Sequence, residues 1–279
     1  MADKIFTLYS GAVVIEFKEA NHSYWKVEKD GKKRRLTGVT TFMKVLDKPA
    51  LVPWAVNTAI DNVRERKEEL QSAGPVAFEE ILESAKNLYI KKKDEAADLG
   101  SIIHNWCEDY IKGKNPVMPE DPQVTQGVLS FLEWVEHSKV KFASSERIIY
   151  SQKYDYVGTL DAEATIGGKL YLIDFKTSNG IYPETRLQTA AYQWADQEER
   201  GVQYEGRWIL RLSKETKKEY DEKMAKKALK YNGRWTPPEY KIFEAVYLDH
   251  DKKDFHKDIK AFLACQQINE WQKTATLQQ

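Results

Sequence analysis

The 279-residue sequence has little cysteine, no excess charge of either sign and no long apolar run. Its two cysteines, Cys107 and Cys265, exclude a disulfide scaffold, a four-cysteine zinc site and an iron–sulfur cluster held by four cysteines of this chain. Basic and acidic residues number 43 each, so any site for a polyanion must be local. Without an 18-residue apolar run or the apolar core of a signal peptide, we expect no membrane span and a cytoplasmic protein.

The distribution of apolar residues predicts a mixed α/β (α+β) fold. Apolar residues make up 42% of the chain, enough for a folded core. A helical period fills most of residues 40–139, whereas a period of two dominates after residue 140. We predict a central mixed sheet flanked by helices, preceded by an N-terminal, mostly helical region, with domains at 1–139 and 140–279. The expected elements are strands within 11–28 and at 146–150, 155–166, 169–177, 204–212 and 241–248, helices at 96–111, 128–140, 184–199 and 254–272, and a charged insertion at about 213–238.

A two-glycine turn at 167–168 joins two predicted strands that carry acidic residues. Strict alternation places Asp161 on the same face as Thr159, and Asp174 on the same face as Lys176. The tight hairpin brings Asp161 and Asp174 to one face of the sheet. Two carboxylates beside a lysine in an apolar run are costly to bury, and a divalent cation such as Mg²⁺ or Mn²⁺ resolves that cost. A surface ion pair between Asp174 and Lys176 is the alternative.

Two further patterns accompany the hairpin. Gln188 and Tyr192 lie four residues apart, hence on one helical face, where they could bind a phosphate or position a water. His104 lies on a predicted helix between Ile103 and Trp106. The alternatives are that Tyr192 is a core residue with Gln188 exposed, and that His104 is a hydrogen-bonded core histidine.

Together these residues resemble the RecB-like branch of the PD-(D/E)XK nuclease superfamily, over residues 96–212. The matching motifs are Gly100-x-x-x-His104, Gly158-x-x-Asp161, Asp174-Phe-Lys176-Thr and Gln188-x-x-x-Tyr192, in the order and spacing of that family. The segments at 38–41 and 51–55 are also similar to those of phage-encoded exonucleases and the mitochondrial genome maintenance exonuclease. The sequence has no phosphate-binding loop of the Gly-x-x-x-x-Gly-Lys-Ser/Thr type, so we expect no fused ATP-driven helicase.

The resemblance implies a restriction-endonuclease-like core and metal-dependent hydrolysis of DNA. It implies that Asp161, Asp174, the carbonyl of Phe175 and His104 bind Mg²⁺ or Mn²⁺. Lys176 would orient the attacking water or neutralise charge, and Gln188 and Tyr192 would position the phosphate or the water. Three acidic residues are further candidates: Glu108 as an outer partner that orients His104, Glu146 as a second-shell or second-metal ligand, and Glu163 as a possible outer residue. Surface charge is the alternative for Glu108 and Glu146.

We expect local basic segments to bind DNA; the alternative is that they form a solubilising surface. The candidates are Lys32, Lys33, Arg34, Arg35, Lys214, Lys217, Lys218, Lys226, Lys227, Lys230, Arg234 and Trp235. By analogy with the family we expect an exonuclease that acts on single strands or duplex ends, with phage recombination or replication proteins as partners and a phage or bacterial host cytoplasm as its location. The alternatives are an endonuclease of the same core and an inactive DNA-binding or scaffold protein.

Overall fold

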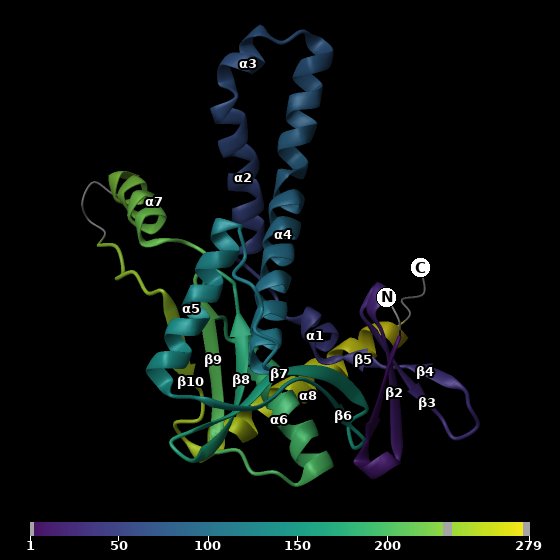
Figure 1. Cartoon of the computed structure of the whole chain (residues 1–279). Coiled ribbons are helices and arrows are strands. Elements are labelled where there is room, and N and C mark those ends of the chain that lie inside the picture. Colours follow the sequence, from purple (N-terminus) through teal and green to yellow (C-terminus); the bar gives the residue numbers. More distant parts are fainter. Residues whose placement is uncertain (1–2, 231–235, 276–279) are drawn as a thin grey trace. The chain divides into compact units, whose positions relative to one another are not determined.

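The computed structural model describes residues 3–230 and 236–275 and has a mixed α/β fold, as predicted (Figure 1). Contacts within the chain divide it into one unit of Met1–Leu46 with Ile103–Gln279 and a second unit of Asp47–Ile102. This division does not coincide with the expected boundary between residues 139 and 140. No described helix is both long enough and apolar enough to cross a membrane.

A mixed sheet of six strands forms the centre of the first unit. Its strands follow the order β10-β9-β8-β7-β5, and β6 pairs with β7. β9 runs parallel to β8 and β5 runs parallel to β7, while the other pairs are antiparallel. The bounds are β5 Thr37–Gly38, β6 Lys141–Ser151, β7 Tyr156–Ile166, β8 Lys169–Lys176, β9 Gly206–Leu212 and β10 Phe243–Tyr247.

The hairpin of β7 and β8 turns at Gly167 and Gly168, as predicted. Both glycines have positive φ, 59° and 82°, which suits the tight two-residue turn that joins strands of this twist. Beyond the turn the register pairs Glu163 with Leu172 and Ala162 with Ile173. The sequence therefore fixes which residues of the two strands lie opposite one another near the turn.

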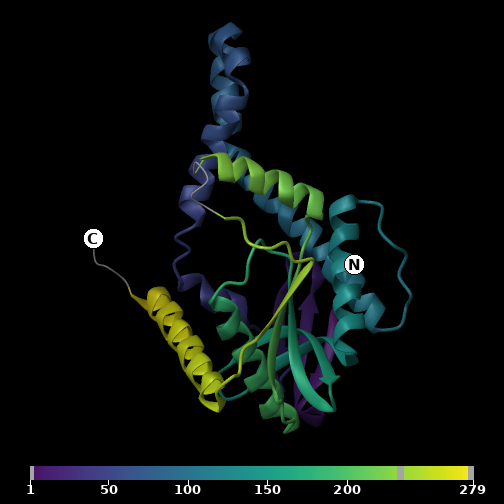
Figure 2. The same cartoon turned by 90° about the vertical axis from the view of Figure 1, so that its left-hand side faces the viewer.

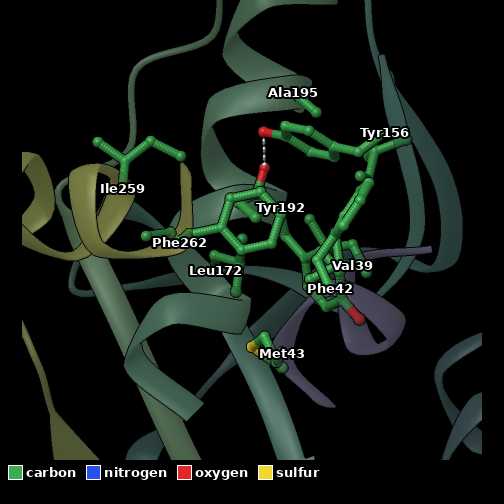
Figure 3. Packing of buried hydrophobic residues seen from close by; sticks show 13 residues of the cluster. Val39, Phe42, Met43, Tyr156, Leu172, Tyr192, Ala195, Ile259 and Phe262 are labelled. Carbon is green, nitrogen blue, oxygen red and sulfur yellow. Dashed lines mark hydrogen bonds between the residues drawn. The ribbon is translucent and has the colours of Figure 1, made fainter. Parts of the chain in front are cut away.

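Helices cover the sheet on both faces. α6 (Glu184–Arg200) and α8 (Lys252–Thr274) pack together against one face, and Tyr156 of β7 donates a hydrogen bond to the carbonyl of Ala191 within their apolar cluster (Figure 3). Figure 2 shows α8 in yellow. α5 (Pro122–Ser138) begins where the Asp121 side chain accepts hydrogen bonds from the N–H groups of Gln123 and Val124, and it packs on β9 and β10. It ends at Ser138, two residues before the predicted end.

A separate four-stranded antiparallel sheet precedes the central one. The sequence predicts only two strands here, within residues 11–28. The two edge strands, β1 and β4, lie outside that range, and β4 consists of exposed basic residues that pair with β3. The sheet packs on β6 and β7 through an apolar cluster that includes Ile15 and Val157. The bounds are β1 Lys4–Leu8, η1 Tyr9–Gly11, β2 Val13–Lys18, η2 Glu19–Asn21, β3 Ser23–Val27 and β4 Lys33–Arg35, followed by α1 Val39–Phe42 and η3 Met43–Val45.

The remaining elements are helical. α2 (Leu51–Glu65) and α3 (Lys67–Ser72) lie in the second unit, and α4 (Pro75–Ile111) continues from it into the first. The helix predicted at 96–111 is thus the end of a longer one, since no proline or glycine pair interrupts residues 76–99. Within the predicted insertion the structure has α7 (Lys217–Lys230).

Candidate metal-binding and catalytic site

The centre of the site is an interruption in the pairing of β7 with its neighbours. On one edge, the pairs Ser145–Ala162 and Arg147–Leu160 flank Glu146 and Asp161, which are themselves unpaired. On the other edge, β8 pairs with β7 from residue 162 onward and β5 pairs at residues 156–157. The stretch of β7 between these pairings contains Asp161, so its carboxylate lies where the strands separate.

The predicted strict alternation along β7 is wrong between residues 159 and 163. Thr159 Oγ1 lies 2.8 Å from the hydroxyl of Tyr24, which belongs to the N-terminal sheet. Glu163 instead accepts a hydrogen bond from Arg200 of α6, on the other face. The physical reason is the irregular backbone at this point, where Glu146 has a left-handed φ of 51° across from Asp161. Thr159 and Glu163 therefore do not share a face.

Three potential metal ligands converge at the interruption. One ligand atom each from His104, Glu146 and Asp161 lies within 4.8 Å of the others. His104, near the end of α4, places Nδ1 3.8 Å from Asp161 Oδ2. The same carboxylate oxygen accepts a hydrogen bond of 2.7 Å from the N–H of Phe175. Phe175, predicted to contribute its carbonyl, thus contacts Asp161 through its N–H.

The second predicted carboxylate lies beside the predicted lysine on β8. Lys176 Nζ is 2.6 Å from Asp174 Oδ2, and Asp174 is only 1% exposed. Beyond this ion pair, neither oxygen of Asp174 accepts a hydrogen bond from any residue that the structure describes. Asp174 is buried and the side chain of Lys176 is only 22% exposed, so this ion pair is not the exposed surface pair of the alternative.

Burial raises the pKa of each of the three acidic groups of the site. Burial, with the charge of Asp161 next, raises the pKa of Glu146 to about 8. Burial raises the pKa of Asp174 to about 6 against the opposing charge of Lys176, and it raises the pKa of Asp161 as well. Burial lowers the pKa of Lys176, but the neighbouring carboxylates outweigh it and raise that pKa above its ordinary value.

The pKa of His104 shifts in the opposite direction. Burial, followed by the positive charge of Lys176, lowers the pKa of His104 to about 4. Its imidazole is therefore neutral near pH 7, and a neutral imidazole is the form that binds a metal ion. The donor set of a neutral imidazole and two clustered carboxylates, with the buried carboxylate of Asp174 paired only with Lys176 among the described residues, fits Mg²⁺ or Mn²⁺.

Gln188 and Tyr192 form a hydrogen-bonded pair on α6. Gln188 Nε2 donates to the hydroxyl of Tyr192 over 2.8 Å, and Tyr192 is buried. The ring of Tyr192 lies against Gly158, where an added Cβ would be 2.6 Å from Cε1. Tyr192 is therefore a core residue, as the alternative states, but Gln188 is half-buried rather than exposed, and the binding of a phosphate or water by this pair stays a prediction. The charges of Asp174 and Asp161 add to the rise in the pKa of Tyr192 that burial causes.

Two of the acidic outer-shell candidates have other partners. Glu108 forms an ion pair with Lys112 one turn later, so the expected role of orienting His104 has no support from the described contacts. Glu163 is bound by Arg200, Tyr204 and Ser144 in a buried network. Of the three candidates, Glu146 alone joins the potential metal ligands among the described residues.

The described basic candidates lie on or just before β4 and α7. Lys32, Lys33 and Arg34 pair with Asp30, Glu16 and Asp155, and Arg35 is the exposed last residue of β4. Lys217 of α7 pairs with Asp221. The other candidates at 214–227 are Lys214, half-buried before α7, and Lys218, Lys226 and Lys227 on α7. Arg234, Trp235 and the side chain of Lys230 lie outside the described residues.

Sequence reasoning missed two residues beside the site, Tyr24 and Thr159. No motif marks a tyrosine 137 positions before Asp161, and no pattern in the sequence indicates that Thr159 contacts it. In comparisons with known proteins, no family model matches this chain, and neither does any curated protein.

Proposed function

We propose that the protein is a metal-dependent nuclease that hydrolyses phosphodiester bonds of DNA with a PD-(D/E)XK-type site. The observation that carries the proposal is the convergence of His104, Glu146 and Asp161 within 4.8 Å, beside the buried pair of Asp174 and Lys176. An acidic cluster without a function would be expected on the surface, where water hydrates its carboxylates. Here Asp174 is buried and paired with Lys176.

The ligands of the cation would be His104, Asp161 and Asp174, with Glu146 as a fourth donor. When bound, a divalent cation polarises the scissile phosphate and makes a water molecule more acidic. The ammonium group of Lys176 neutralises negative charge that develops on the phosphate. The hydroxyl of Tyr192, held by Gln188, supplies a hydrogen bond to a phosphate oxygen or to water. The expected mode is exonucleolytic, on the strength of the family resemblance.

A digestion assay tests this proposal. End-labelled linear DNA, single-stranded and duplex, is incubated with Mg²⁺, with Mn²⁺ or with EDTA. We expect cleavage only with the cations, and loss of at least 100-fold in rate in Asp161→Asn, while Glu205→Gln, which alters an exposed carboxylate paired with Lys169, retains the wild-type rate. Closed circular DNA in parallel separates an endonuclease, which cleaves it, from an exonuclease. Cation-independent cleavage, or none of any DNA form, contradicts the proposal.

A further inference from the structure

A buried tyrosine of the N-terminal sheet forms a side-chain hydrogen bond with the strand that carries Asp161. Tyr24 of β3 is 7% exposed, and its hydroxyl lies 2.8 Å from Oγ1 of Thr159. Its ring packs against Phe17 of β2 with centroids 4.9 Å apart, so the phenol is held from behind by its own sheet. This part-buried hydrogen bond joins β3 to β7 two residues before Asp161.

The opposite face of β7 is held at the neighbouring residue. Tyr192 of α6 packs on Gly158, where even a methyl group would collide with its ring. Tyr192 of α6 therefore contacts residue 158 on one face of β7, and Tyr24 of β3 contacts residue 159 on the other. Immediately after them the pairing of β7 is interrupted and Glu146 adopts its left-handed backbone. An irregular backbone of this kind persists only where surrounding contacts fix it.

We propose that Tyr24 and Thr159 form a positioning pair that fixes β7 immediately before Asp161, so that the carboxylates of Asp161 and Glu146 converge on one cation. This inference rests on the proposed function and extends it, because it makes the N-terminal sheet a working part of the metal site. The charge of Glu146 contributes to the raised pKa of Tyr24, in line with the closeness of the phenol to the cluster.

The chain offers a matched control in Tyr9. Its hydroxyl donates a 2.8 Å hydrogen bond to the carbonyl of Tyr150, so it also joins the N-terminal segment to the central sheet. Tyr150 pairs with Val157, four residues before Asp161. Tyr9→Phe and Tyr24→Phe each remove one hydroxyl from the same apolar cluster, and only the second touches the residues that precede Asp161.

The test measures Mn²⁺ affinity by electron paramagnetic resonance in wild type, Tyr24→Phe, Thr159→Val and Tyr9→Phe. We expect roughly tenfold weaker binding in Tyr24→Phe and in Thr159→Val, the lower end of the effect of outer-shell partners. The double variant is expected to lose no more than either single variant, because both changes break one interaction. Tyr9→Phe should stay within about twofold of wild type. Urea unfolding checks that the two tyrosine variants have equal stability.

Amide hydrogen exchange over residues 158–163 of the metal-free protein provides a second measurement. We expect faster exchange in Tyr24→Phe than in Tyr9→Phe. Equal Mn²⁺ affinity and equal exchange in these two variants would overturn the inference. If wild type binds no Mn²⁺, the proposed function fails, and the exchange measurement still decides whether the pair fixes β7.

Discussion

Glu146 of β6 faces Asp161 of β7 across the one point between Ser145 and Arg147 where the two strands do not pair, and it does so with a backbone φ of 51°. A left-handed backbone costs a residue with a side chain about 1–2 kcal/mol. The raised pKa of Glu146 shows that its carboxylate is also disfavoured there in its charged form. Two unfavourable features at one residue indicate that stability has been sacrificed for the arrangement of the carboxylates.

Uncharged substitutions at Glu146 measure the backbone strain apart from the cost of the buried charge. We expect Glu146→Gly to be about 1 kcal/mol more stable than Glu146→Ala in the metal-free protein, because glycine adopts positive φ without strain. At Ser145 on the same strand the order is expected to reverse, with alanine the more stable. Urea unfolding of the four variants measures this. An alanine as stable as glycine at position 146 would show that the backbone is not strained there.

The ion pair of Asp174 and Lys176 gives a prediction that distinguishes catalysis from stability. Lys176→Met leaves a buried carboxylate unpaired and is expected to lower the free energy of unfolding by about 3 kcal/mol at pH 7. The double variant Asp174→Asn/Lys176→Met removes both charges, so it should regain most of that loss.

Nuclease activity should be lost in the single and in the double variant, because a restored fold does not restore the lysine. Urea unfolding and the digestion assay, run on the same preparations, measure both quantities. A double variant that is less stable than Lys176→Met would contradict a compensating pair. Activity in the double variant would remove both residues from the proposed chemistry.

Several features of the β7–β8 hairpin can be predicted from the sequence alone. The turn at 167–168, the strands on either side and the placement of Asp174 beside Lys176 follow from a two-glycine turn and a period of two, which are local properties. Asp161 joins the cluster as predicted, but for a different geometric reason. It lies where the pairing of β7 with β6 is interrupted, opposite the left-handed backbone of Glu146, which no local pattern in the sequence reveals.

Contacts distant in sequence were beyond prediction. The bond between Tyr24 and Thr159 joins residues 135 positions apart, and β4 exists only because β3 pairs with it. Glu108 shows the reverse case. Its helical spacing from His104 suggested a partnership, but Lys112 lies at the same spacing on the other side and carries a full positive charge, so the ion pair forms instead.

Gly158 tests the packing of Tyr192. In Gly158→Ala the new methyl group would lie 2.6 Å from Cε1 and 3.2 Å from Cδ1 of Tyr192, so the ring must move. We expect a loss of about 1–3 kcal/mol in the free energy of unfolding and a weaker hold of Gln188 on the displaced hydroxyl. Gly180→Ala is the control, because nothing lies within 4 Å of its added Cβ. Thermal unfolding measures the difference, and equal melting temperatures would refute the close packing.

Asp196 of α6 gives a prediction for the pH dependence of stability away from the proposed site. Its side chain is fully buried and is hydrogen-bonded by Arg147, Arg200 and Tyr204. Burial raises the pKa of Asp196, but these hydrogen bonds outweigh it and hold the pKa below its ordinary value. The folded protein therefore binds the proton of this carboxyl more weakly than the unfolded chain does.

It follows that Asp196 stabilises the fold at pH values above the unfolded pKa of about 3.9, and that this stabilisation is lost as the pH falls through the lower pKa of the folded state. At pH 7, Asp196→Asn should lower the free energy of unfolding by about 3 kcal/mol, because it removes the buried negative charge that pairs with Arg147 and Arg200. The gap between wild type and variant should narrow below about pH 4. Asp221→Asn, which alters an exposed pair with Lys217, should change stability by less than about 0.5 kcal/mol at either pH. Urea unfolding from pH 7 to pH 3 measures all three proteins, and a gap that stays constant across this range would show that Asp196 does not titrate below its unfolded pKa in the folded state.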